Sequence, residues 1–172
     1  MKNTIRAVFF QIFVGVLIFF LSFLINMSDV VRNFMYSNIV FRVILCFVPL
    51  YLYYNLGKGM NKKKAKGLDF FTGSVVFLIA LILAFIAFAG LGMKLFTSDY
   101  FSSMWRLPLD VFLYPQNYIC SLMGINHGVA AFVGGAVLPS FIFGLSIKSS
   151  RKKMLRLKRM KRMREMRNNR GY

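Results

Sequence analysis

Few side chains in this sequence suit acid–base chemistry, and the best candidates lie outside its apolar segments. Asp110 and His127 have the right types for a proton-transferring pair, because a carboxylate can orient an imidazole that takes up or releases a proton. A single histidine beside an apolar segment more often caps a helix or lies at an interface, so we expect no catalytic role for the pair. The other polar residues of this kind are Asp29, Asp99, Asn117 and Asn126.

Other catalytic and cofactor-binding patterns are missing from the sequence. It contains no His-Glu-x-x-His, no Cys-x-x-Cys and no glycine-rich phosphate loop. Cys46 lies in an apolar run and Cys120 in a polar, aromatic stretch, so they make a poor disulfide pair, and one histidine cannot complete a zinc site with them. We therefore expect no enzyme activity, no metal and no cofactor.

Ionisable side chains are also missing from the centres of the apolar segments. Coupled transporters and proton pumps usually keep an acid, a base or a histidine near the bilayer midplane, because translocated charge needs a partner there. This pattern therefore disfavours proton or cation coupling. The centres lie near Gly15, Phe47, Ile82 and Val137, and the nearest polar groups are Gln11, Asn26 and Ser140.

The elements that must position these residues are membrane helices. Of the 172 residues, 58% are hydrophobic and only 16% are charged, whereas a soluble domain is usually about half apolar and about a quarter charged. Stretches of about 20 apolar residues can cross a hydrocarbon layer of roughly 30 Å. We predict an all-α integral membrane protein with a four-helix transmembrane domain over residues 1–147, its spans at 5–27, 38–56, 70–95 and 128–147, an outer connection over 96–127, and a basic cytoplasmic tail over 148–172.

The distribution of Lys and Arg predicts the orientation. Nineteen of the 23 basic residues fall in the N-terminus, the loop between the second and third spans, and the tail. Basic residues favour the cytoplasmic side of a membrane. Both termini are therefore expected in the cytoplasm of a multi-pass protein of the cell membrane, and the abundance of Phe and Lys favours a bacterial inner membrane.

Arg42 and the outer connection carry further expectations. Arg42 lies about one turn inside the second span, so its stem is expected to lie along lipid while the guanidinium reaches the headgroups. The aromatic connection is typical of a segment on the membrane surface or dipping partly into it. Within it we expect a helix broken at Pro115, with one side lined by Leu109, Phe112, Ile119 and Met123.

Small side chains predict the faces through which the spans pack. Small residues three or four positions apart let two membrane helices approach closely. Gly134 and Pro139 are predicted hinge positions, because proline removes a backbone donor and bends a helix. The predicted packing residues are Ala80, Ala84, Ala87 and Gly90 on the third span, with Gly124, Gly128, Ala131 and Gly135 before and on the fourth.

The tail is the strongest pointer to a partner. Twelve of its 25 residues are Lys or Arg, against the single acid Glu165. Methionines and one leucine recur in it at three-residue spacing, a stripe that winds around a helix because each step drifts by about 60°. A solvated topology anchor would explain the charge, and the alternatives are binding to anionic lipid, to RNA or to an acidic protein surface. The predicted binding residues are Lys62, Lys63, Lys64, Lys66, Arg151, Lys152, Lys153, Arg156, Lys158, Arg159, Lys161, Arg162 and Arg164.

These patterns together predict a non-enzymatic accessory or scaffold subunit of a membrane complex. Its partners would be the lipid bilayer with its anionic lipids, other membrane subunits or a second copy of the chain, and RNA as a further candidate for the tail. An alternative is a small oligomeric transport or pore component. A membrane enzyme using Asp110 and His127 on the outer face comes third.

Overall fold

The computed structural model describes residues 2–60, 70–96, 103–126 and 128–169, and every regular element in these ranges is a helix. Helices satisfy their own backbone donors and acceptors, which lipid cannot do. The elements in chain order are α1 (Lys2–Asn26), α2 (Asp29–Ser37), α3 (Ile39–Lys58), η1 (Phe70–Gly73), α4 (Ser74–Leu91), η2 (Gly92–Phe96), α5 (Leu107–Phe112), α6 (Tyr114–Met123) and α7 (Val129–Asn169).

Four of these stretches are long and apolar enough to cross a membrane: α1, α3, Phe70–Leu91 and α7. Each lies on one of the predicted spans, so the helices are compatible with a multi-pass membrane protein. The third is shorter than predicted because Gly92, with a φ of 58°, ends α4 before residue 95.

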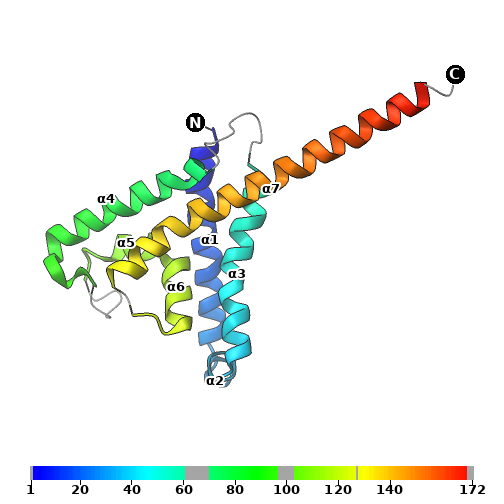
Figure 1. Cartoon of the computed structure of the whole chain (residues 1–172). Helices are drawn as coiled ribbons and strands as arrows, with labels where there is room; N and C mark the ends of the chain where they lie inside the picture. Colours follow the sequence, from blue (N-terminus) through cyan, green and yellow to red (C-terminus); the bar gives the residue numbers. More distant parts are fainter. Residues whose placement is uncertain (1, 61–69, 97–102, 127, 170–172) are drawn as a thin grey trace.

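The long helices contact different partners at the two ends of the bundle. α1 and α3 lie side by side and are joined by α2 at one end, which we call the α2 face (Figure 1). α7 crosses α1 and α3 obliquely, and α4 runs alongside α7 (Figure 1). Towards the other end, the Ser146 hydroxyl donates to the Tyr54 carbonyl (2.5 Å), and the Tyr54 hydroxyl donates to Ser149 (3.2 Å).

The predicted outer connection is folded into the bundle as a helical hairpin. Only Leu113 separates α5 from α6, and Pro115 lies in the first turn of α6, which confirms the predicted break near Pro115. α6 packs against α1, α3 and α7, and α5 packs against α1 and α4. Of the four residues predicted to line one side of this broken helix, Leu109 is buried and Met123 is 63% exposed.

The hairpin, Leu107–Met123, reaches deep into the bundle. Its turn contacts Gln11, which at 1.5 Å per residue lies roughly 22 Å along α1 from Asn26. Backbone that breaks its helix at such a depth is found only where protein or a cavity surrounds it. The connection therefore contributes a buried element to the bundle in addition to the four long helices.

The basic tail continues the last long helix. α7 has 41 residues, which corresponds to a length of roughly 60 Å. Its C-terminal part, Lys148–Asn169, extends away from the rest of the molecule (Figure 1), and we call it the arm. The boundary predicted at residue 148 is thus the point where α7 leaves the rest of the bundle, and the helix itself continues past it.

Candidate functional site

A buried network of hydrogen bonds holds the turn of the hairpin. The Tyr53 hydroxyl donates to Gln11 Oε1 (2.7 Å), and Gln116 Nε2 donates to the Tyr53 oxygen (3.1 Å). Gln11 Nε2 donates to Gln116 Oε1 (3.2 Å). All three side chains are at most 2% exposed, so α1, α3 and α6 are joined by polar groups in an apolar interior.

Gln11 has a second role at the end of α5. A helix that stops leaves its last carbonyls without backbone partners, and such groups are costly inside a membrane. Gln11 Nε2 donates to the carbonyl of Phe112, the last residue of α5, at 2.7 Å. The Gln11 side chain therefore satisfies a backbone carbonyl at the helix break of the hairpin.

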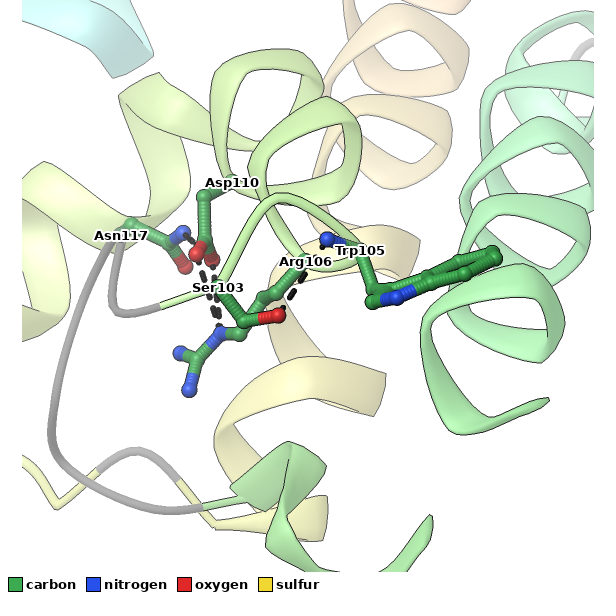
Figure 2. A network of polar contacts seen from close by, with 5 residues as sticks. All are labelled: Ser103, Trp105, Arg106, Asp110 and Asn117. Atoms are coloured by element: carbon green, nitrogen blue, oxygen red, sulfur yellow. Dashed lines mark hydrogen bonds and ion pairs between the residues drawn. The ribbon is translucent and has the colours of Figure 1, made fainter. Parts of the chain in front are cut away.

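An ion pair buried in the hairpin lies nearer the α2 face. Arg106 Nε is 3.0 Å from Asp110 Oδ2, and Asn117 Nδ2 donates to Asp110 Oδ1 at 3.2 Å (Figure 2). The Arg106 and Asp110 side chains are 6% and 3% exposed. Removing two charges from water is costly unless they pair well, so this arrangement fixes α5 to α6 in one geometry.

Trp105 fastens the start of the hairpin to α4. Its ring points away from the ion pair towards a neighbouring helix (Figure 2), and a Cβ added at Gly90 would overlap that ring. Gly90 was predicted to let another helix approach closely, and it lies instead against the ring of Trp105, which precedes α5.

The predicted packing alanines of α4 face both the hairpin and α7. Ala80, Ala84 and Ala87 are buried in one apolar cluster. The cluster brings α4 against Leu109 of α5, Leu113 between α5 and α6, and Ala136 of α7.

Some of the other predicted packing and hinge residues lie in helix contacts or line a cavity, and others have no close neighbour. Gly135 is buried, and a Cβ there would lie 3.1 Å from Gln116 Cβ. Gly128 and Ala131 line a small cavity beside Arg106 and Asp110. Gly124 has a φ of 67° and caps the C-terminus of α6, where no helix approaches it. Gly134 is exposed with nothing near its Cβ position, and Pro139 lies buried inside the continuous α7.

The closest helix contacts use small residues that the sequence analysis did not select. A Cβ added at Gly57 would lie 2.8 Å from Ser146 Cβ. Gly73 faces the Ser140 backbone, and Gly144 faces the Phe70 ring. The spacing of Ala136, Ser140 and Gly144, four residues apart on α7, is the sequence signal that could have found this face.

A cavity of about 460 Å³ lies between α1, α2, α3 and the hairpin near the α2 face. Arg42, expected to reach lipid headgroups along the bundle surface, lines this cavity, and its Nε is buried without a hydrogen-bond partner. The remaining lining residues are Ser22, Asn26, Tyr36, Asp110, Tyr114, Asn117, Tyr118, Ser121 and Leu122.

The predicted basic residues divide into two groups. Lys62, Lys63, Lys64 and Lys66 lie outside the described residues. The arm residues are exposed from Lys152 to Met166, and Arg151 is half-buried. Lys161 and Glu165 form the ion pair described in the arm, at 3.9 Å and on an exposed surface.

The predicted acid–base pair cannot be assembled from the described part of the chain. His127 lies outside it, and Asp110 is held by Arg106 and Asn117. No three His, Cys, Asp or Glu side chains of the described residues lie close enough to hold a metal ion. Cys46 and Cys120 are both free thiols.

Comparison with protein-family models, curated proteins and solved structures finds no match to this chain. The function of the site therefore has to be inferred from its geometry and charge.

Proposed function

We propose that this chain is a non-enzymatic accessory subunit of a membrane complex that holds a polyanionic partner on its cytoplasmic side through the arm. The partner would be an anionic lipid surface, RNA or an acidic protein. The observation that carries this proposal is that the arm is a helical continuation of α7, exposed over nearly its whole length and extending from the body (Figure 1).

The charge of the arm exceeds what orientation requires. A few basic residues near the end of a span are enough to favour the cytoplasmic side. Here basic residues continue to the end of α7, and several lie four apart, such as Lys148 with Lys152 and Lys158 with Arg162. Like charges at this spacing destabilise an isolated helix. A bound polyanion would remove that repulsion, so binding and helix formation would support each other.

Apolar side chains give the arm a second type of contact. Leu155 and Leu157 are exposed by more than half, as are Met163 and Met166. Methionine adapts to irregular surfaces. Attraction by charge followed by contact through these side chains would suit a partner surface that is acidic and partly apolar.

The test is co-purification in a mild detergent, followed by mass spectrometry, with a variant that keeps the membrane anchor. In this variant Lys148, Arg151, Lys152 and Lys153 remain, so the orientation should not change. In this distal-arm variant, six of the eight basic residues beyond Lys153 are replaced by glutamine: Arg156, Lys158, Arg159, Lys161, Arg162 and Arg164. We expect the native chain to retain a partner that the variant loses. Recovery of the same partner with both chains would refute the proposal.

A transport or pore component is the second candidate. The hairpin favours it, because it would be re-entrant in a membrane and broken helices at membrane depth often line solute paths. The cavity on the α2 face is lined by residues of the hairpin, but not by Gln11 or Tyr53, whose network lies deeper. Solute flux in liposomes that persists in the distal-arm variant would favour this candidate over the first.

The enzyme hypothesis receives no support from Asp110. Its carboxylate is engaged by Arg106 and Asn117, which leaves it poorly placed to accept a proton from a substrate.

A further inference from the structure

Arg42 lies between two hollows that differ in the polarity of their lining residues. One is the polar cavity of about 460 Å³ on the α2 face. The other is an apolar groove of about 340 Å³ along α3 and α6. Arg42 and Leu122 line both, so the two hollows meet at the guanidinium.

The polar cavity suits an anion. Its lining supplies hydroxyl or amide donors from Ser22, Asn26, Tyr36 and Asn117 in addition to Arg42. A guanidinium presents several N–H donors in a planar fork, which matches the oxygens of a phosphate. The buried Arg42 Nε has no hydrogen-bond partner among the described residues, so the protein does not satisfy all the donors of this guanidinium.

The balance of charge around the cavity points the same way. Asp110 is the only acid among the lining residues, and it forms the ion pair with Arg106. Arg42 has no carboxylate within ion-pair distance among the described residues. Among the described residues, Arg42 is therefore a cation without a carboxylate partner, and a bound anion would neutralise it.

The groove suits a hydrocarbon chain. Apart from Arg42 its lining is apolar: Ile39, Val43, Cys46, Phe47, Leu50, Ile119, Leu122 and Met123. Arg42 lies about 5 Å along α3 from Ile39, close to the end of the span. A phosphate held there would be near headgroup level, and a chain attached to it would run along the groove into the hydrocarbon layer.

We propose that this paired site binds one anionic phospholipid, with its phosphate in the polar cavity against Arg42 and an acyl chain in the groove between α3 and α6. The site is separate from the arm, so it does not depend on the proposed function. It would fasten the hairpin to α3 with a lipid taken from the leaflet on the α2 face.

The test measures binding of phosphatidylglycerol to the purified full-length protein in neutral detergent by native mass spectrometry. Phosphatidylcholine and inorganic phosphate serve as the comparison ligands. The variant Arg42→Gln removes the charge, and Arg32→Gln is the matched control, because Arg32 is an exposed arginine of α2 paired with Asp29. We expect Arg42→Gln to bind phosphatidylglycerol at least tenfold more weakly, the size of effect typical of one charge-assisted contact. Arg32→Gln should bind as the native chain does.

A second variant tests the groove without altering any charge. Ile119→Trp fills the groove and should also weaken phosphatidylglycerol binding about tenfold, which keeps the proposal testable if Arg42→Gln does not fold. Equal binding of phosphatidylglycerol and phosphatidylcholine, or unchanged binding by Ile119→Trp, would overturn the proposal. If inorganic phosphate binds the protein as tightly as phosphatidylglycerol does, the site is one for a free anion, and the proposal is overturned.

The arm supplies the remaining control. Because it is basic, it contributes background binding of anionic lipid to every one of these proteins. The distal-arm variant should keep the difference between native and Arg42→Gln proteins. Loss of that difference would assign the lipid to the arm and refute the site.

Discussion

Individual polar side chains explain how this bundle tolerates a broken helix. Gln11, Tyr53 and Gln116 satisfy one another, and Gln11 also satisfies the carbonyl of Phe112. The sequence shows Gln11 as an isolated amide in an apolar segment, but its partners are 42 and 105 positions away. No local pattern connects residues so far apart, so the network could not be predicted.

Tyr53→Phe tests the network with a single atom. Removing the hydroxyl leaves the Gln11 and Gln116 amides short of a buried partner, which should lower the free energy of unfolding by about 1–3 kcal/mol. The measurement is unfolding by sodium dodecyl sulfate in mixed micelles. Tyr51→Phe is the matched control because Tyr51 is on the same helix and 65% exposed. Equal stability of the two variants would show that the network contributes little.

Asp110→Asn tests the buried ion pair. The substitution removes the Asp110 charge from the buried pair with Arg106, and breaking a buried ion pair costs about 3–5 kcal/mol. Asp29→Asn breaks an exposed pair with Arg32 and should cost at most about 1 kcal/mol. The same unfolding titration measures both. If Asp110→Asn is no more destabilising than Asp29→Asn, the pair does not hold the hairpin.

At the scale of the elements, length and hydropathy were sufficient to predict the four long helices. The hairpin was harder, because α5 and α6 have only 6 and 10 residues and resemble an interfacial connection in sequence. The buried pairing of Arg106 with Asp110 could not be predicted for the same reason, because both residues lie in this connection and outside the predicted spans. Small-residue patterns predicted the α4 face but not Gly57, Gly73 or Gly144, because the sequence does not say which helices meet.

Gly57→Ala tests the α3–α7 contact. Its new methyl group would collide with Ser146, so the substitution should destabilise the protein by about 1–3 kcal/mol. Gly134→Ala is the control, because its Cβ meets nothing and alanine favours a helix interior by up to about 1 kcal/mol. Thermal unfolding in detergent should lower the midpoint for the first variant and leave or raise it for the second. The opposite order would contradict the described packing.

Cysteine labelling tests the re-entrant path of the hairpin. In a background with Cys46 and Cys120 replaced by alanine, single cysteines at Met104 and Met123 would mark the two ends of the hairpin; both positions are exposed. An impermeant maleimide should label both from one side of sealed vesicles, and a cysteine at Met160 of the arm from the other side. Labelling of Met104 and Met123 from opposite sides would show that the connection crosses the membrane.

At the scale of the whole molecule, the two faces carry different features. The α2 face has the Arg42 cavity, and the opposite end has the arm (Figure 1). Charge counting predicted a basic tail, but not that it continues α7 as one helix, because repulsion between like charges argues against a helix there. The continuous helix is what turns a topology signal into a candidate binding element.

The most direct test of the proposed function is binding of defined polyanions to the purified protein in nanodiscs of zwitterionic lipid. The probes are vesicles containing phosphatidylglycerol, single-stranded RNA and polyglutamate, each measured with the native chain and with the distal-arm variant. We predict that the native chain binds at least one probe with an affinity that falls steeply with added salt, and that the variant binds that probe at least tenfold more weakly. Equal binding by the two proteins, or no binding of any probe by the native chain, would contradict the assignment of the arm as the binding element.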